Sequence, residues 1–261
     1  MDRAPLDAGR LRAALGPRWA SVSVVQQTSS TNADLLAAAA AGAADRTLLA
    51  AEVQLAGRGR FDRVWSSPRG AGLTVSFLLR PAAPTATWGW LPLLAGVALA
   101  ATLRDAVGVP AVLKWPNDVL GPGGKLAGIL VQAGSGAAVV GVGLNVSTTA
   151  EELPVGTASS LVLAGAADVD RTELLAAYAT ALDRWARRWD EAGGDAGRCG
   201  LADAYSGLCD TLGRQVRVTL GGGAALEGRA EAVAAGGALM LRTAAGVRTV
   251  SAGDVEHLRP A

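Results

Sequence analysis

An arginine- and glycine-rich segment, residues 56–65, has the composition of an anion-binding loop. It reads Ala-Gly-Arg-Gly-Arg-Phe-Asp-Arg-Val-Trp and contains Arg58, Arg60 and Arg63. A guanidinium group offers a planar set of donors that fits phosphate and carboxylate oxygens. Glycine lets the backbone approach an anion closely, and Trp65 can stack on a planar base. Taken alone, such a segment can also be a solvated basic turn.

Both lysines of the chain, Lys114 and Lys125, lie close together downstream of this loop. Lys114 begins the sequence Lys-Trp-Pro-Asn-Asp, and Lys125 begins Lys-Leu-Ala-Gly-Ile. We expect each at the end of a strand, where a rigid element can aim its ammonium group. Residues 141–145, Gly-Val-Gly-Leu-Asn, predict a strand with one polar side chain among apolar neighbours. Singly, these motifs are also typical of solvated lysines, turns and ordinary strands.

Composition restricts the possible functions. The 261 residues are 50% hydrophobic and 18% charged, as in globular proteins, and the net charge of +1 means that any basic site is local. We expect Cys199 and Cys209 to be free thiols, with a disulfide as the alternative. One histidine, His257, near the C-terminus, argues against a Cys/His zinc site and a Ser-His-Asp triad. We interpret it as a structural residue at a strand end.

The sequence indicates a cytoplasmic protein. Its first twenty residues do not have the pattern of a secretory signal. The longest apolar stretch, Leu91–Leu103, contains Pro92 and is too short to span a bilayer.

Several elements must position the candidate residues. Hydrophobic patterning predicts strands at 22–25, 48–54, 73–79, 112–115, 126–132 and 137–146. It predicts helices at 33–41, after a Ser/Thr/Asn cap at 29–32, at 90–107, and at 170–191. In the last helix an apolar stripe at helical spacing predicts a core face, made of Leu174, Tyr178, Leu182, Trp185 and Trp189. From about residue 212, short alternating runs separated by glycines predict a small all-β module.

Five motifs in order resemble those of biotin protein ligases, which attach biotin to carboxylase carrier domains. They are Ser-Thr-Asn (30–32), the Gly-Arg-Gly-Arg loop ending in tryptophan, Lys-Trp-Pro-Asn-Asp, Lys-Leu-Ala-Gly-Ile, and Gly-x-Gly-x-Asn. The resemblance spans roughly residues 22–147, and the β module near 212–259 is similar to the SH3-like barrel that ends these enzymes.

The resemblance implies an α+β fold. A mixed-sheet catalytic domain flanked by helices, like class II synthetases and of biotin/lipoate ligase type, would be followed by a small C-terminal SH3-like β-barrel. The implied division is a lead-in at 1–20, a catalytic domain at 21–210 and a C-terminal domain at 211–261. This corresponds to the family form without an N-terminal DNA-binding domain, because only about twenty residues precede the first predicted strand.

The resemblance also implies residue roles. The implied biotin-binding residues are Ser30, Thr31, Asn32, Gln54, Gly57, Arg58, Gly59, Arg60, Lys125 and Gly128. The implied ATP-binding residues are Arg58, Arg60, Arg63, Trp65, Lys114, Asn117, Asp118, Lys125 and Asn145. Lys125, Arg60 and Asp118 would be catalytic, with Lys125 between the biotin carboxylate and the phosphate and Trp65 against adenine. Many family members have glycine where this chain has Asp62, which lowers the positive charge and flexibility of the loop.

The implied reaction joins biotin and ATP to give biotinyl-5′-AMP and pyrophosphate. A lysine on the biotin carboxyl carrier domain of an acetyl-/acyl-CoA or pyruvate carboxylase then attacks the mixed anhydride. Because a carboxylate must approach a triphosphate, the site needs fixed positive charge, with Mg²⁺ held mainly through the phosphates. We expect residues 57–65 to be mobile without ligand and to close over the anhydride. A monomer or weak homodimer, acting without DNA or membrane, is expected.

Two other functions would use part of the same residue set. A lipoate–protein ligase would use the same adenylate chemistry but would not need the Ser-Thr-Asn turn. A non-enzymatic biotin sensor would not need Lys125 or three loop arginines. The sequence does not contain a P-loop motif, and its Gly-x-Gly lies inside a predicted strand, which argues against a dinucleotide site.

Overall fold

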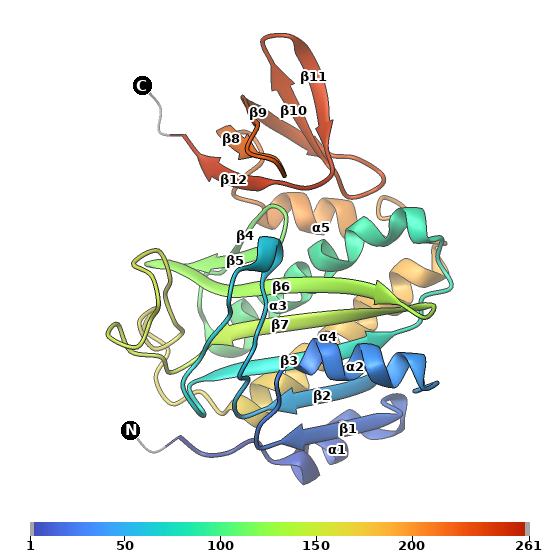
Figure 1. Cartoon of the computed structure of the whole chain (residues 1–261), viewed down its shortest axis with the longest axis vertical. Helices are drawn as coiled ribbons and strands as arrows, with labels where there is room; N and C mark the ends of the chain where they lie inside the picture. The colour runs from blue at the N-terminus through green and yellow to red at the C-terminus, as the bar shows by residue number, and fades with distance from the viewer. Residues whose placement is uncertain (1–2, 259–261) are drawn as a thin grey trace.

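The computed structural model describes residues 3–258, except for the side chain of Asp62. Two β-sheets organise the described part of the chain (Figure 1). The larger sheet has seven strands in the order β1-β2-β3-β7-β6-β5-β4. Its strands are β1 (Ser21–Val25), β2 (Thr47–Ala51), β3 (Gly72–Leu79), β4 (Val112–Lys114), β5 (Asp118–Gly121), β6 (Gly124–Gly134) and β7 (Ala137–Asn145). Only β1 and β2 pair in parallel, so the sheet is mixed, as predicted.

Five α-helices and three short 3₁₀ helices accompany the strands in the described residues. They are α1 (Ala8–Leu15), η1 (Gly16–Arg18), α2 (Thr31–Ala40), η2 (Arg60–Asp62), η3 (Thr85–Trp90), α3 (Leu91–Val107), α4 (Arg171–Glu191) and α5 (Leu201–Leu208). Side-chain caps begin α2, at the predicted cap, and α4. The Ser30 side chain accepts a hydrogen bond at the start of α2, and the Asp170 side chain accepts two at the start of α4. These bonds satisfy backbone donors that have no partner within the helix.

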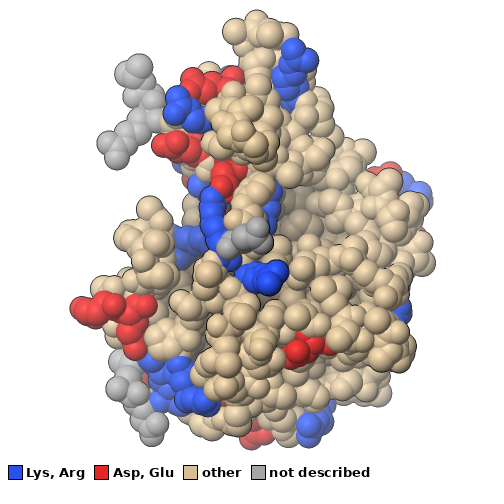
Figure 2. Space-filling view, viewed as in Figure 1, with Lys and Arg blue, Asp and Glu red and all other residues tan. Residues whose placement is uncertain are grey.

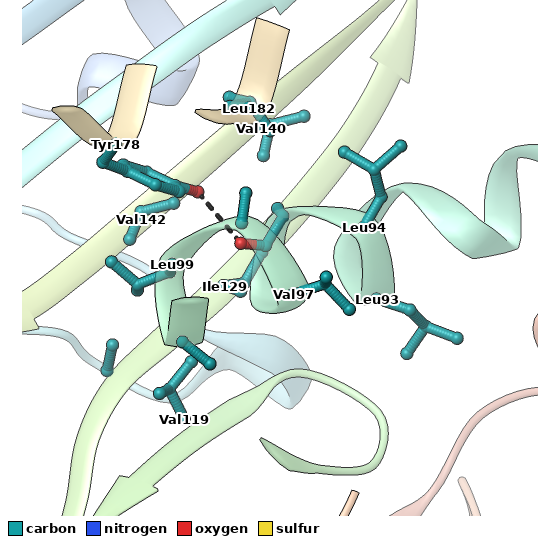
Figure 3. Packing of buried hydrophobic residues seen from close by; sticks show 14 of the residues in the cluster. Leu93, Leu94, Val97, Leu99, Val119, Ile129, Val140, Val142, Tyr178 and Leu182 are labelled. Atoms are coloured by element: carbon teal, nitrogen blue, oxygen red, sulfur yellow. Dashed lines mark hydrogen bonds between the residues drawn. The ribbon is translucent and has the colours of Figure 1, made fainter. Parts of the chain in front are cut away.

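One face of the larger sheet forms the main core against α3 and α4 (Figure 3). Val140 and Val142 of β7 lie on this face, in the same buried cluster as Leu94 and Leu182. The hydroxyl group of Tyr178 on α4 donates a hydrogen bond of 3.4 Å to the carbonyl oxygen of Ala95 on α3 (Figure 3). Burying each such aliphatic side chain stabilises the fold by about 1.5–3 kcal/mol. The core therefore holds the sheet rigid from one side.

The opposite face of the sheet is only partly covered. Helix α2 packs Leu35 and Ala39 against one end of β3 and β7. Elsewhere on this face, strand alternation presents polar residues and glycines, namely Thr74, Ser76, Gly128, Gly141, Gly143 and Asn145. The sheet therefore has one strongly apolar face, which packs into the core. Its second face is polar and glycine-rich, as suits a binding site.

The C-terminal module is a five-stranded antiparallel sheet, in the order β11-β10-β9-β8-β12. Its strands are β8 (Gln215–Thr219), β9 (Ala225–Val233), β10 (Leu239–Thr243), β11 (Gly246–Val250) and β12 (Asp254–His257). The module lies beyond the β4–β5 edge of the larger sheet, next to α5 (Figure 1).

Two buried tryptophans fasten the module to the larger domain. The indole N–H of Trp90 donates to the carbonyl oxygen of Ala235 (2.8 Å), and that of Trp115 donates to Gly237 (3.1 Å). The backbones of Gly89 and Gly237 approach so closely that a Cβ atom on either residue would overlap the opposing chain. These contacts leave little freedom for the module to shift against α3.

Several details differ from the sequence-based expectations. Strand β2 ends at Ala51, so Gln54 lies beyond it and forms an isolated bridge with Thr28. Asp118, which lies outside the strands predicted at 112–115 and 126–132, begins strand β5, and helix α5 was not predicted. Both cysteines are buried and free, as expected.

The apolar segment around α3 is longer than the sequence suggested. Thr85–Val107 is long and apolar enough to cross a membrane by length and composition alone, but 67% of its most apolar window is buried inside the fold. Its hydrophobicity is therefore explained by its place in the core.

Candidate active site

A cavity of about 550 Å³ lies over the polar face of the larger sheet. Its walls come from the start of α2, from strands β3 to β7, from residues 154–158 and from the C-terminal module. Residues 57–65, here named the arginine loop, supply a further wall. Figure 2 shows lysine and arginine side chains gathered at the hollow between the module and the larger domain.

A single row of paired residues crosses the floor of the cavity. The strand register aligns Lys114, Asp118, Gly128, Gly143 and Thr74 on five neighbouring strands. Residues opposite each other in paired strands present their side chains on the same face. Because the two central positions are glycines, three strand spacings leave a hollow about 14 Å wide between the Asp118 and Thr74 positions. A ring system can therefore approach the backbone of β6 and β7.

Charged side chains border one end of this hollow. The Nζ atom of Lys125 lies 2.6 Å from the Oδ1 atom of Asp118, and both side chains are partly buried. Burial lowers the pKa of Arg60 from its ordinary value, and the neighbouring Arg63 adds to this, while the charge of Asp118 opposes it. Asp118 thus lies close to two cations, Lys125 and Arg60, that can bind an anion.

The Lys-Trp-Pro-Asn-Asp segment is held by main-chain and amide contacts. The Nδ2 atom of Asn117 donates to the carbonyl oxygen of Ile129 (2.8 Å), and the backbone N–H of Ile129 donates back to Asn117 (3.0 Å). The Oδ1 atom of Asn117 accepts a hydrogen bond from Arg60 Nη1 at 3.4 Å. Asn117 therefore links the rigid sheet to the arginine loop.

The start of α2 forms the other end of the site. The Oε1 atom of Gln54 accepts hydrogen bonds from the backbone N–H of Thr31 (2.9 Å) and from its hydroxyl (3.1 Å). Ser30 caps the same helix. This arrangement fixes small hydrogen-bonding groups at the cavity wall.

Asn32 is buried and largely engaged with the protein itself. Its Nδ2 atom donates to Leu130 O (3.2 Å) and to Gln132 Oε1 (2.8 Å), and its Oδ1 atom lies 2.6 Å from Ser76 Oγ. A Cβ atom on Gly141 would overlap Asn32 Oδ1. Asn32 thus anchors α2 to the sheet, and the sequence did not identify its partners Ser76 and Gln132. The only signal for Ser76 was a polar residue two positions from Thr74 in an apolar strand.

Trp65 lies against the glycines of the floor. A Cβ atom on Gly143 would overlap the Trp65 indole, and one on Gly128 would lie 3.4 Å from it. The Trp65 Nε1 atom is buried and has no hydrogen-bond partner among the described residues. A buried unpaired donor is costly, so this N–H is available to an acceptor on a ligand.

The cavity brings together the candidate residues from all five motifs, and all of them except Gly57 line it. Gly57 does not line the cavity itself. A Cβ atom there would overlap Gln54 Nε2 and the carbonyl oxygen of Trp65. Its absent side chain lets these two groups approach each other.

Some residues that line the cavity were not predicted from the sequence. Val155 and Thr157 come from a segment without a recognisable motif, and Asp254 comes from the C-terminal module. Residues 157–159 bond to the backbone of Lys125 on both sides. The sequence carries no local signal for such contacts, because they arise only when distant segments fold together.

Among the described residues, no group of three or more His, Cys, Asp or Glu side chains is arranged to hold a metal ion. Among the side chains that the structure describes, Asp118 and Asp254 are the carboxylates in the cavity wall, and each pairs with a cation. This donor set does not fit a resident metal site built by the protein alone.

Residues 24–148 match the Biotin/lipoate A/B protein ligase family, and residues 211–258 match the Biotin protein ligase C terminal domain. The Biotin--[acetyl-CoA-carboxylase] ligase of Mycobacterium tuberculosis is 42% identical, with 98% of this chain and 97% of that protein covered. The protein of the same name from Paracoccus denitrificans is 34% identical, with 89% and 98% covered.

The solved structure of the biotin protein ligase from Aquifex aeolicus in complex with biotin and ATP is also similar. It has a TM-score of 0.77 and 26% identity, and the match covers 91% of this chain and 98% of that one. Two domain matches, near-complete coverage of a relative and a shared fold agree with the geometry of the cavity: the chain belongs to the biotin protein ligase family.

Proposed function

We propose that this protein activates biotin with ATP to form biotinyl-5′-AMP and transfers the biotinyl group to a lysine of a biotin carboxyl carrier domain. The observation that carries the proposal is the Lys125–Asp118 pair beside Arg60, at one end of a glycine-floored hollow. A carboxylate and a polyphosphate repel each other, and this cluster supplies the fixed cations that offset the repulsion.

In the first step, a biotin carboxylate oxygen forms a bond to the α-phosphorus of ATP, and the bond to the departing pyrophosphate breaks. Lys125 would lie between the carboxylate and the α-phosphate, and Arg58, Arg60 and Arg63 would bind the phosphates. Holding both reactants in line contributes several kcal/mol to such reactions. Mg²⁺ would enter with ATP as part of the substrate, bound through the phosphates.

In the second step, the amine of the carrier lysine attacks the carbonyl carbon of the anhydride and AMP leaves. Asp118 would orient the incoming amine or accept its proton, once ligand phosphate has drawn Lys125 away. The start of α2, with Thr31 and Gln54, would bind the ureido ring of biotin, and Trp65 would pack against adenine. Asn32, whose amide is already engaged, would support this wall.

The proposal extends to the acceptor protein, the cellular compartment, the oligomeric state and the domain boundary. The acceptor would be the carrier domain of an acetyl-/acyl-CoA or pyruvate carboxylase. The enzyme would work in the cytoplasm as a monomer or weak homodimer, without binding DNA. The division at about residue 211 would separate the catalytic domain from the C-terminal domain.

The direct test incubates the protein with biotin, ATP, Mg²⁺ and a purified carrier domain, followed by mass spectrometry of the carrier. We expect the mass of one biotinyl group on one lysine, and none on a carrier whose acceptor lysine is replaced. Modification with lipoate in preference to biotin would favour the lipoate ligase alternative. Biotin binding without any adenylate would favour the sensor.

A further inference from the structure

The C-terminal module contributes a charged residue to the cavity. Asp254 and Val255, at the start of β12, are part of its wall. The carboxylate of Asp254 forms an ion pair with the guanidinium group of Arg63 in the arginine loop. These residues are 191 positions apart in the sequence, so the pair links the arginine loop to the C-terminal module.

A second contact joins the same two segments. The Nη1 atom of Arg60 donates to the carbonyl oxygen of Gly253 at 3.1 Å, next to Asp254. The same nitrogen lies 3.4 Å from Asn117 Oδ1 on the larger domain. The arginine loop is therefore attached both to the sheet and to the turn that precedes β12.

The module can act as a fixed support for the loop. The Trp90 and Trp115 indoles and the close Gly89–Gly237 backbone contact hold it against the larger domain. An acceptor on a fixed support restricts the arginine that binds it, which is how supporting residues preorganise a site.

Arg63 has N–H donors that its ion pair with Asp254 does not use. A guanidinium group has five N–H donors, and the bond to Asp254 uses Nη2. Its side chain is 63% exposed, against 37% for Asp254, so the pair lies at the mouth of the cavity and not in the interior. The remaining donors can bind an anion while Asp254 fixes the direction of the side chain.

We propose that Asp254 is a positioning residue for ATP: it directs Arg63 toward the phosphates and holds the arginine loop over the cavity. This inference rests on the proposed function for its ligand. ATP is favoured over biotin as the ligand, because a polyphosphate carries more charge than one carboxylate. Its binding is therefore weakened more when an arginine points in the wrong direction.

One experiment needs no ligand. Trypsin cleaves after arginine, and the arginine loop contains Arg58, Arg60 and Arg63. Asp254→Asn removes the ion pair but no cleavage site. We expect cleavage within the loop, identified by mass spectrometry, to be about twofold to fivefold faster than in the wild type, as suits the loss of one exposed ion pair. Glu256→Gln, which removes one charge from the same strand outside the cavity, is the matched control and should leave the rate unchanged.

A kinetic cycle tests the action through Arg63. In biotin-dependent adenylate formation, Asp254→Asn should raise the KM for ATP about threefold with little change in the KM for biotin. Asp254→Glu should restore most of this. In an Arg63→Gln background, Asp254→Asn should have no further effect, because the residue through which it acts is gone.

The outcomes separate the two proposals. An unchanged trypsin rate and an unchanged KM for ATP in Asp254→Asn would overturn the inference while leaving the ligase activity standing. A lower KM for ATP would also overturn it, since Asp254 would then compete with the nucleotide for Arg63. If adenylate never forms, the proposed function fails, and the trypsin rates alone decide whether Asp254 holds the loop.

Discussion

The Nζ atom of Lys125 lies 2.6 Å from Asp118 Oδ1. Under the proposed function, both residues would contact an anionic substrate. Without ligand, this pairing offsets the cost of keeping a lysine partly buried. A phosphate that enters the site competes with Asp118 for the ammonium group. Under the proposed function, one carboxylate would thus support the lysine before ATP binds and become available for the second chemical step.

Lys125→Ala should lower the rate of adenylate formation by about 100-fold or more, because it removes a fixed charge from between the reacting groups. Biotin-dependent release of pyrophosphate measures this step. Lys125→Arg, which keeps the charge but changes its shape, should lie between the alanine variant and the wild type. Near-normal pyrophosphate release by Lys125→Ala would contradict the role.

Asp118→Asn should slow transfer to the carrier by about 10-fold or more while affecting adenylate formation less, since its carboxylate acts mainly on the incoming amine. Single-turnover transfer from preformed adenylate, compared with pyrophosphate release, separates the two steps. Equal losses in both steps would show that Asp118 serves only to position Lys125.

Gly143→Ala should displace the Trp65 indole, because the new methyl group would overlap the ring. Overpacking of this kind costs about 1–3 kcal/mol, so we expect the KM for ATP to rise by about 10-fold. Gly207→Ala in α5 meets no atom within 4 Å and is the matched control. Unchanged kinetics in Gly143→Ala would mean that the KM for ATP does not depend on the position of the Trp65 indole against Gly143.

These sites differ in how far the sequence predicted them. The Ser30 cap, strands β3 and β7 and the glycines of β7 follow from local patterns, and the structure has them where expected. Partners such as Ser76 for Asn32 and Asp254 for Arg63 join segments 44 and 191 residues apart. Local spacing cannot specify contacts of that kind, because they depend on the register of the sheet and on how the module docks.

Strand β5 and helix α5 were not predicted from the sequence, for a related reason. β5 is only four residues long and is stabilised by pairing with β4 and β6, so its own sequence resembles a turn. Helix α5 lacks a side-chain cap and is held by burial of Leu201 and Tyr205. Tertiary contacts determine both elements.

Arg171→Ala should lower the free energy of unfolding by about 3–5 kcal/mol, because it leaves the carboxylate of Glu52 buried without its partner. Arg171 also donates to Ala4 O and Gly72 O, which ties the N-terminal segment to β3. Urea unfolding measures the change. Arg10→Ala, which removes two exposed ion pairs, with Asp170 and Glu173, at the same end of α4, should lower the free energy of unfolding much less. Similar losses in both variants would contradict the distinction.

Stability should fall as the pH drops below about 6.5, the ordinary pKa of histidine. Burial lowers the pKa of His257, Lys114 and Arg214 contribute in the same direction, and Asp210 opposes them. The unfolded state then binds a proton at a higher pH than the folded state, so stability is present above about pH 6.5 and is lost below it until the folded-state pKa is reached. Because His257 is the one histidine of the sequence, His257→Gln should flatten the dependence of the unfolding free energy on pH in this window. An unchanged slope would assign the effect to other groups.

Biotin-dependent exchange of labelled pyrophosphate into ATP tests the central assignment most directly, because it reports the joining of a biotin carboxylate to the α-phosphate. The wild-type protein with Mg²⁺ should catalyse exchange only when biotin is present, and Lys125→Ala should nearly abolish it. Exchange that does not depend on biotin, or none at all from folded protein, would contradict the account.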